Sequence, residues 1–154
     1  MSIEIASAED AEQLEKIISA DFPYKMLTRE KISERMKRPG TTVFKSTVEG
    51  RVIGFAEVEI RGSGGMFMAI SVLPEERGKG RARELLESAM AHMEVHGVKK
   101  AFLLVKKTNK RAKKIYANAG FSFTKMHEKD IEGEKIEVWE KELAGNPHEV
   151  RGFN

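Results

Sequence analysis

The residues with the clearest chemical potential form a short basic segment with two glycines, Arg77-Gly78-Lys79-Gly80-Arg81-Ala82. It follows an apolar run at residues 65–73 and opens a run with helical periodicity. Glycine lacks the Cβ atom that would keep a ligand off the backbone, and the first N–H groups of a helix have no partner inside it. The helix dipole and three basic side chains add to the attraction of an anion. The segment is therefore a candidate pyrophosphate-binding turn.

Other interpretations of this turn can be weighed on the same residues. A P-loop needs Ser or Thr after its lysine, but Gly80 follows Lys79. A dinucleotide-binding fingerprint would place a third glycine where Arg83 stands, so a Rossmann fold is excluded as well. A strand-to-helix turn that simply requires glycine explains the segment equally well and stays open.

Composition predicts one cytoplasmic globular domain. With 154 residues, 40% of them hydrophobic, the chain can bury a core. It has no cysteine, and residues 1–19 lack the basic start and apolar core of a signal peptide. No apolar run approaches the roughly 18 residues of a membrane span, so no membrane association is expected. The net charge of +3 argues only weakly for nucleic acid, and the four histidines lack metal-ligand spacing, so no metal is expected.

The patterns predict an α/β (α+β) fold with a mixed sheet. Strands are expected at residues 2–6, 41–48, 51–60, 65–73, 100–105, 121–126 and 135–143, and helices at 8–20, 28–38, 80–96 and 109–119. Ser7, Thr28 and Asn109 are the expected helix caps. A helix separates the strands at 65–73 and 100–105, so these two strands should be parallel. Residues 1–143 form the expected domain, and residues 144–154 a tail.

Two separated motifs carry a family resemblance. The first is Val72-x-Pro74-x-x-Arg77-Gly78-x-Gly80-x-Ala82, and the second is Asn109-x-x-Ala112-x-x-x-Tyr116-x-x-x-Gly120-Phe121. In this order the chain resembles the GNAT superfamily of acetyl-coenzyme-A-dependent N-acetyltransferases over roughly residues 2–143. The resemblance implies a mostly antiparallel central sheet of about six or seven strands with about four helices, whose fourth and fifth strands splay apart to admit acetyl-CoA.

The resemblance also implies where the cosubstrate binds. Backbone groups of Ile70, Ser71 and Val72 would hold the pantetheine arm, and the turn from Arg77 to Ala82, including Lys79 and Arg81, would hold the pyrophosphate. Asn109 is a candidate cofactor contact, although helix capping alone accounts for it. The basic residues between Lys99 and Lys114 form either a solvated face or an attractive surface for the phosphates of coenzyme A.

Tyr116 is the candidate general acid, because a phenol with an ordinary pKa near 10 is protonated at neutral pH. A half-buried core tyrosine is the alternative. Members of this family often carry a glutamate early in the strand before the turn, but residues 64–68 hold no titratable side chain. Glu57 and Glu59, two apart on the neighbouring strand, are the candidate bases, and a solvated strand face is their alternative role.

The acceptor is expected to be a primary amine, on a small molecule or on a protein terminus or lysine. Phe22, Tyr24 and Met26 suggest a partly apolar wall of its site, and the acidic tip at residues 130–134 would favour a cationic amine. Nucleic acid is not an expected partner, because the basic segment lacks interleaved aromatics, and a homodimer stays open. The alternative function is a non-catalytic acyl-CoA-binding regulatory module that has lost its base.

Overall fold

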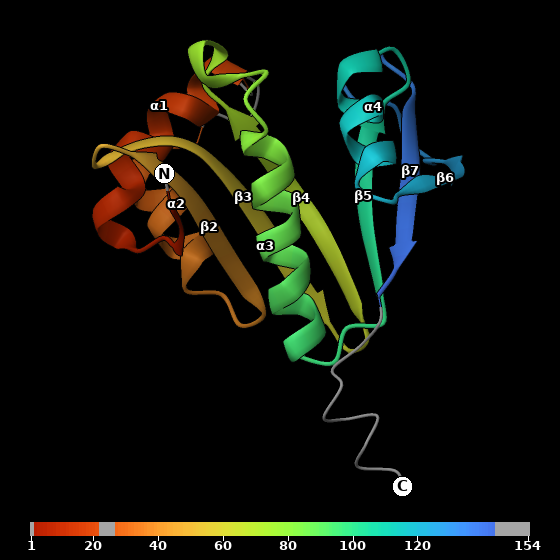
Figure 1. Cartoon of the computed structure of the whole chain (residues 1–154), viewed down its shortest axis with the longest axis horizontal. Coiled ribbons are helices and arrows are strands. Elements are labelled where there is room, and N and C mark those ends of the chain that lie inside the picture. Colours follow the sequence, from red (N-terminus) through yellow and green to blue (C-terminus); the bar gives the residue numbers. More distant parts are fainter. Residues whose placement is uncertain (1, 22–26, 144–154) are drawn as a thin grey trace, which may run out of the picture. The chain divides into compact units, whose positions relative to one another are not determined.

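The computed structural model describes residues 2–21 and 27–143 (Figure 1). Within these residues the strands are β1 (Ser2–Ile5), β2 (Thr41–Val48), β3 (Arg51–Arg61), β4 (Gly64–Val72), β5 (Lys100–Lys106), β6 (Ser122–Met126) and β7 (Ile136–Glu142). The helices are α1 (Ala11–Asp21), α2 (Arg29–Met36), α3 (Arg81–Val95) and α4 (Lys110–Asn118). Two 3-10 turns, η1 (Ala8–Asp10) and η3 (Pro74–Glu76), precede α1 and follow β4. None of the described helices combines the length and apolar character that a membrane crossing requires.

The predicted helix caps form as local chemistry dictates. The Thr28 hydroxyl accepts from the Lys31 N–H at 3.3 Å, and the Asn109 side chain accepts from the Ala112 N–H at 3.1 Å. The first helix, expected from residue 8, begins instead with η1, whose Asp10 carboxylate accepts from the Ser7 N–H at 2.9 Å. The second helix ends at residue 36 rather than 38, because the residue before Pro39 avoids helical backbone angles.

The strands form one mixed sheet in the order β1-β2-β3-β4-β5-β7-β6. The β4–β5 pair is parallel, as expected for strands joined by a crossover helix, while β1–β2, β2–β3, β5–β7 and β6–β7 are antiparallel. The β4–β5 ladder pairs Gly64–Phe67 with Lys100–Leu103 and stops there, although both strands continue. This agrees with the splayed fourth and fifth strands of the predicted fold.

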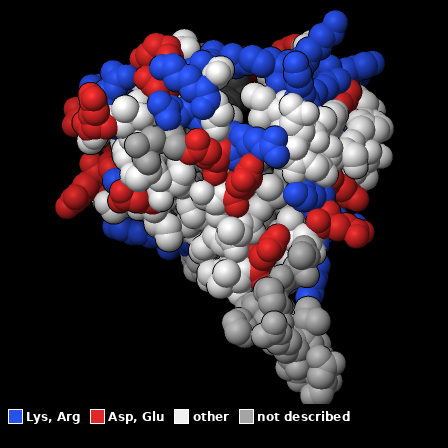
Figure 2. Space-filling view, in the orientation of Figure 1, with Lys and Arg blue, Asp and Glu red and all other residues white. Residues whose placement is uncertain are grey.

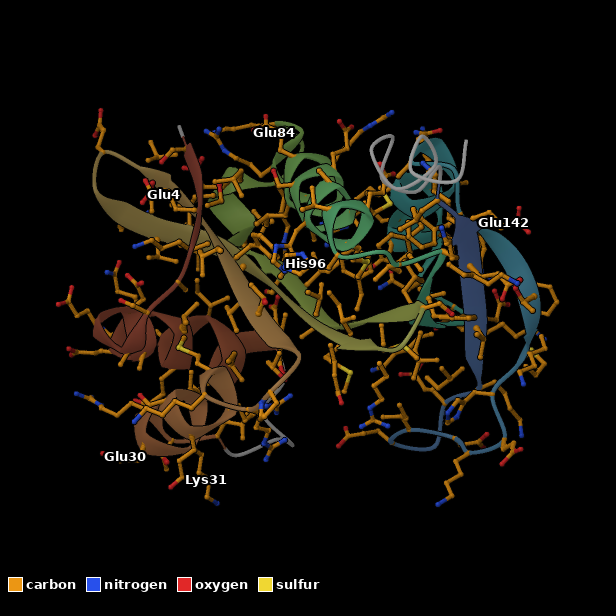
Figure 3. All side chains as sticks on the ribbon, turned by 90° about the horizontal axis from the view of Figure 1, so that it is seen from below. Glu4, Glu30, Lys31, Glu84, His96 and Glu142 are labelled. Atoms are coloured by element: carbon orange, nitrogen blue, oxygen red, sulfur yellow. The ribbon has the colours of Figure 1, made fainter. Side chains whose placement is uncertain are left out.

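The chain divides into two compact units. Unit 1 consists of residues 1–59 and 69–89. In it, α1 and α2 cover one face of β2 and β3, and the first half of α3 covers the other; Glu30 and Lys31 of α2 point away from the strands (Figure 3). The apolar stripes of α1 and α2 pack on the strands through a buried cluster that includes Leu14, Ile32 and Phe55. Burial of each such side chain stabilises the unit by roughly 1.5–3 kcal/mol.

Unit 2 consists of residues 60–68 and 90–154. Its core includes Met93, Val98 and Leu103, all 2% exposed or less, and the rings of Phe67 and Phe121 meet edge to face at 6.1 Å. A Cβ atom on Gly65 would stand 2.7 Å from the Met93 sulfur, so a larger residue at that point of β4 would force the Met93 side chain to move. The α4 helix lies over β5 and β7 within this unit (Figure 1).

Candidate functional site

The predicted pyrophosphate turn lies in unit 1, between η3 and α3. Gly78 and Gly80 have φ angles of 78° and 81°, in the left-handed region that glycine adopts without steric cost. The first N–H to donate within the helix is that of Glu84, which bonds to the Gly80 carbonyl at 3.1 Å. The N–H groups that precede it therefore have no acceptor inside α3. A Cβ atom on either glycine would meet no protein atom within 4 Å, so the protein leaves the space beside this backbone open.

The three basic side chains of the turn are each bonded to a carboxylate. Arg77 contacts Asp21 at 3.2 Å, while Lys79 and Arg81 contact Glu76 at 3.5 Å and 3.1 Å. The hydrogen bond from Arg81 and the charge of Lys79 hold the pKa of Glu76 below its usual value. The sequence suggested three full positive charges around an anion, but two carboxylates offset them. The backbone amides and the helix dipole are thus the main attraction that the turn offers.

The strand that leads into this turn carries the other predicted cofactor residues. Ile70 is partly exposed, whereas Ser71 and Val72 are buried. All three lie beyond Phe67, where the pairing of β4 with β5 ends. Their backbone groups therefore take no part in that ladder.

Glu57, a candidate base, is held in an ion pair. Its carboxylate lies 2.7 Å from the Arg35 guanidinium of α2, and the two side chains are 11% and 19% exposed. Glu59 lies two residues further along β3, on the same face, and is partly exposed. This charge-assisted hydrogen bond connects α2 to β3, so a packing role stands beside the predicted role of Glu57 as a base.

Tyr116, the candidate acid, lies on α4 in unit 2. Its ring meets that of Phe121 edge to face, with centroids 6.4 Å apart. Burial raises the pKa of Tyr116 to about 12, against an opposing effect of the Arg111 charge. The phenol is therefore fully protonated at neutral pH. Asn109 caps the same helix, which orients Tyr116 by fixing where α4 begins.

Lys and Arg side chains gather over α4 (Figure 2). Lys107, Lys110, Arg111 and Lys114 are exposed, whereas Lys113 reaches inward to Glu137 at 3.1 Å. Their exposure is compatible with both roles that the sequence left open, a solvated face and a surface that attracts the phosphates of coenzyme A.

Glu137 of β7 is a buried carboxylate that sequence reasoning missed. One of its oxygens accepts from the Trp139 indole N–H at 2.9 Å, and the other from Lys113. Burial opposes its ionisation, but these two partners together hold the pKa of Glu137 below its usual value. The sequence carried no signal for this group, because its partner on α4 is known only once the helix is placed on the sheet.

Most of the residues predicted to line the acceptor site lie outside the described part of the chain. Phe22, Tyr24 and Met26 lie outside the described residues. At the other predicted wall, Glu134 pairs with Lys106 at 2.9 Å and Asp130 with Lys135 at 3.3 Å. The hydrogen bond from Lys106 lowers the pKa of Glu134. Lys106 and Lys135 therefore offset part of the negative charge at the tip of this hairpin. No cluster of side chains able to hold a metal ion occurs in the described part of the chain.

Comparison with known proteins identifies the family. The family model described as "Acetyltransferase (GNAT) domain" matches residues 5–143. The chain belongs to the GNAT acetyltransferase family. The match contains both motifs around Gly78 and Tyr116, and the mixed sheet with its parallel β4–β5 pair is the GNAT fold. Acyl transfer with coenzyme A as carrier is the chemistry that this membership supports.

Individual relatives of this GNAT chain are distant. Over 87 residues it is 29% identical to the mycothiol acetyltransferase of Stackebrandtia nassauensis; the match covers 54% of this chain and 28% of that protein, so the chain spans only about a quarter of that relative. Many solved structures share the fold, among them the two that follow. The Escherichia coli ribosomal-protein-S18-alanine N-acetyltransferase has a TM-score of 0.80 at 20% identity, with 95% of this chain and 97% of that chain covered. The PaiA N-acetyltransferase of Thermoplasma acidophilum, in complex with coenzyme A, has a TM-score of 0.76 at 23% identity, with 93% and 100% covered.

Proposed function

We propose that this protein is an N-acetyltransferase that moves the acetyl group of acetyl-CoA to a primary amine by direct attack in a ternary complex. The observation that carries the proposal is the turn at Gly78 and Gly80, where both glycines have positive φ angles and no other protein atom lies within 4 Å of their Cβ positions. Membership of the GNAT family supports acetyl-CoA as the ligand of that turn. A diphosphate is the kind of anion that the amides and the dipole at a helix N-terminus attract.

The protein's part in the reaction begins with orientation. The backbone of Ile70–Val72 would bond to the pantetheine arm, and the amides from Gly78 to Ala82 would bond to the diphosphate. Acetyl-CoA supplies an activated thioester, so the protein need only hold its carbonyl carbon within reach of an uncharged amine. Asp21 pairs with Arg77, and Glu76 pairs with Lys79 and Arg81, so these carboxylates offset the basic side chains of the turn.

Tyr116 would act on the departing sulfur as a hydrogen-bond donor. Its pKa of about 12 lies about 3.5 units above that of an ordinary thiol, so complete proton transfer from the phenol would be uphill by about 5 kcal/mol. A hydrogen bond to the developing thiolate needs no complete transfer and stabilises charge by about 1.5–3 kcal/mol. The raised pKa therefore supports a stabilising role for Tyr116, with the proton of the attacking amine neutralising the thiolate.

The proposal assigns no fixed base to Glu57, because Arg35 already holds its carboxylate. Glu59 remains the proposed acceptor, directly or through water, of the proton that an ammonium group must lose before it attacks; the second proton, lost when the amide forms, neutralises the thiolate. For the acceptor we propose a primary amine on a small molecule or on a protein terminus or lysine. The names of the two structural neighbours, both N-acetyltransferases, support a nitrogen acceptor.

A matched set of glycine variants tests the proposal. Gly78→Ala, Gly80→Ala and Gly62→Ala each place a Cβ atom at a positive φ angle, and in each case that atom meets no protein atom within 4 Å. All three should lose similar stability, about 1–2 kcal/mol. Only the turn variants should weaken acetyl-CoA binding, by about tenfold or more, since a lost hydrogen bond to a charged group costs about 1.5–3 kcal/mol. Calorimetric titration gives the affinity for acetyl-CoA. Equal affinities in all three variants would refute the proposal.

A non-catalytic acyl-CoA-binding module is the second candidate. It is favoured by the engagement of Glu57 with Arg35 and by the absence of a titratable side chain in residues 64–68. Release of free coenzyme A in the presence of a pool of amines and peptides separates the two. In an enzyme, Tyr116→Phe should lower this rate about 10- to 100-fold with unchanged acetyl-CoA affinity, whereas a binding module has no rate to lose.

A further inference from the structure

The carboxylate of Asp21, the last residue of α1, is bonded to two distant parts of unit 1. It accepts a hydrogen bond from the Ser71 hydroxyl of β4, and both of its oxygens lie 3.2 Å from the terminal nitrogen of Arg77. Ser71 and Arg77 are 50 and 56 residues away from Asp21 in the sequence. One side chain thus connects the end of α1, the strand before the turn and the first residue of the turn.

Arg77 completes this set of contacts from the other side. Its Nε donates to the Val72 carbonyl at 2.9 Å, while its terminal nitrogen donates to Asp21. The planar guanidinium therefore spans the end of β4 and the end of α1, which a flexible ammonium could not do with fixed geometry. Ser71 is 5% exposed, and the side chains of Asp21 and Arg77 are 27% and 30% exposed, so these contacts are partly shielded from water.

We propose that Asp21, Ser71 and Arg77, here named the Asp21 clasp, hold the cofactor turn in its binding conformation, with Asp21 as a positioning residue for acetyl-CoA. This inference rests on the proposed function. The turn contains two glycines, which have the most backbone freedom to lose when a ligand orders them. A turn that is already held by the clasp loses less freedom on binding, so its amides bind the diphosphate more tightly.

The proposal reverses the role that the sequence suggested for Arg77. Its charge is offset by Asp21 and its donors are directed at Asp21 and Val72, so it holds the turn rather than contacting the phosphates. Removal of Asp21 would have two opposing effects: a less ordered turn weakens binding, and a more positive surface strengthens it. Salt separates them, because at about 1 M the charge effect is screened beyond about 3 Å whereas the loss of order persists.

Three variants and one control make the test. Asp21→Ala removes the clasp, Asp21→Asn keeps an accepting oxygen without the charge, and Ser71→Ala removes one hydrogen bond with no change of charge. Glu12→Gln is the control, since Glu12 lies near the opposite end of α1 and its side chain is 59% exposed. Amide hydrogen exchange of residues 70–82 in the ligand-free chain reports whether the turn is held. Calorimetry with coenzyme A and with S-acetylpantetheine, which lacks the diphosphate, reports binding.

The clasp predicts faster exchange across residues 70–82 in Asp21→Ala and Ser71→Ala but not in Glu12→Gln. Coenzyme A should bind Asp21→Ala about tenfold more weakly at low and at high salt, with partial rescue in Asp21→Asn, the order expected for one lost charged hydrogen bond. Affinity for S-acetylpantetheine should fall less than affinity for coenzyme A, because this ligand uses residues 70–72 but not the diphosphate turn. An equal fall for both ligands would indicate a general loss of structure and refute the proposal. Thermal melting confirms that each variant is folded.

The following results would overturn the clasp. Unchanged exchange in Asp21→Ala would show that the turn does not depend on it, whatever the affinity. Equal or tighter binding of coenzyme A at high salt would show that Asp21 only offsets the charge of Arg77. If the wild-type chain does not bind coenzyme A at all, the proposed function is wrong, and the cofactor role of the clasp is then wrong as well. Binding by the wild type together with unchanged variants refutes the clasp alone.

Discussion

The high pKa of Tyr116 can be measured directly, because the chain has only two tyrosines. Tyr24→Phe leaves Tyr116 as the single phenol, and the ultraviolet absorbance of tyrosinate then follows its ionisation. Burial raises the pKa of Tyr116 to about 12, so the midpoint should lie about 2 units above that of an ordinary tyrosine. Circular dichroism over the same pH range shows whether the chain is still folded.

The same shift has a consequence for stability. The folded chain keeps the Tyr116 proton up to about pH 12, whereas the unfolded chain loses it near pH 10. Because the folded pKa is the higher one, the free energy of unfolding should fall as pH rises from about 10 to 12. Two units correspond to about 3 kcal/mol, and Tyr116→Phe should lack this component of the decline. Chemical denaturation in parallel on the two proteins gives the difference.

An ordinary midpoint for Tyr116 would refute the reasoning. A value near 10 in the folded chain would mean that the phenol is solvated. The free-energy cost of full proton transfer to the thiolate would then be smaller, and the argument that Tyr116 only donates a hydrogen bond would fail. A second outcome would also count against it: Tyr116 ionises at the raised pH, but the Tyr116→Phe variant keeps full activity. The ring would then contribute only to packing. In that case the proposed role in stabilising the departing sulfur would be wrong.

Two further predictions concern buried carboxylates. Glu57→Leu leaves Arg35 without its partner and should lower the free energy of unfolding by about 3 kcal/mol. The double variant Arg35→Met with Glu57→Leu should lose clearly less stability. Equal losses in chemical denaturation would contradict this prediction. For Glu137, burial opposes ionisation, but Trp139 and Lys113 hold its pKa below the usual value, so its contribution to stability is lost only as pH falls through that lowered value. The fluorescence of Trp139, the single tryptophan, should therefore show an acid transition below the ordinary glutamate range that Glu137→Gln lacks.

Much of the fold and part of the site could be predicted because their signals are local. A left-handed turn residue, a cap and a two-residue hairpin each depend on neighbours within four positions. The short connections at residues 49–50 and 132–133 show this, with positive φ angles at Glu49, Gly50, Glu132 and Gly133. The two motifs around Gly78 and Tyr116 were likewise sufficient to indicate the GNAT family, which the family match confirms.

The sequence by itself therefore determined the order of elements, the parallel pair and the glycine turn, because helical and strand periodicity and glycine conformation are properties of short segments. Only the tertiary structure decided the partners of the charged groups. It placed Asp21 on Arg77, Glu57 on Arg35 and Glu137 on Lys113, across separations of 56, 22 and 24 residues. An ion pair forms wherever packing brings two side chains within reach, and that distance depends on register and helix placement rather than on residue type.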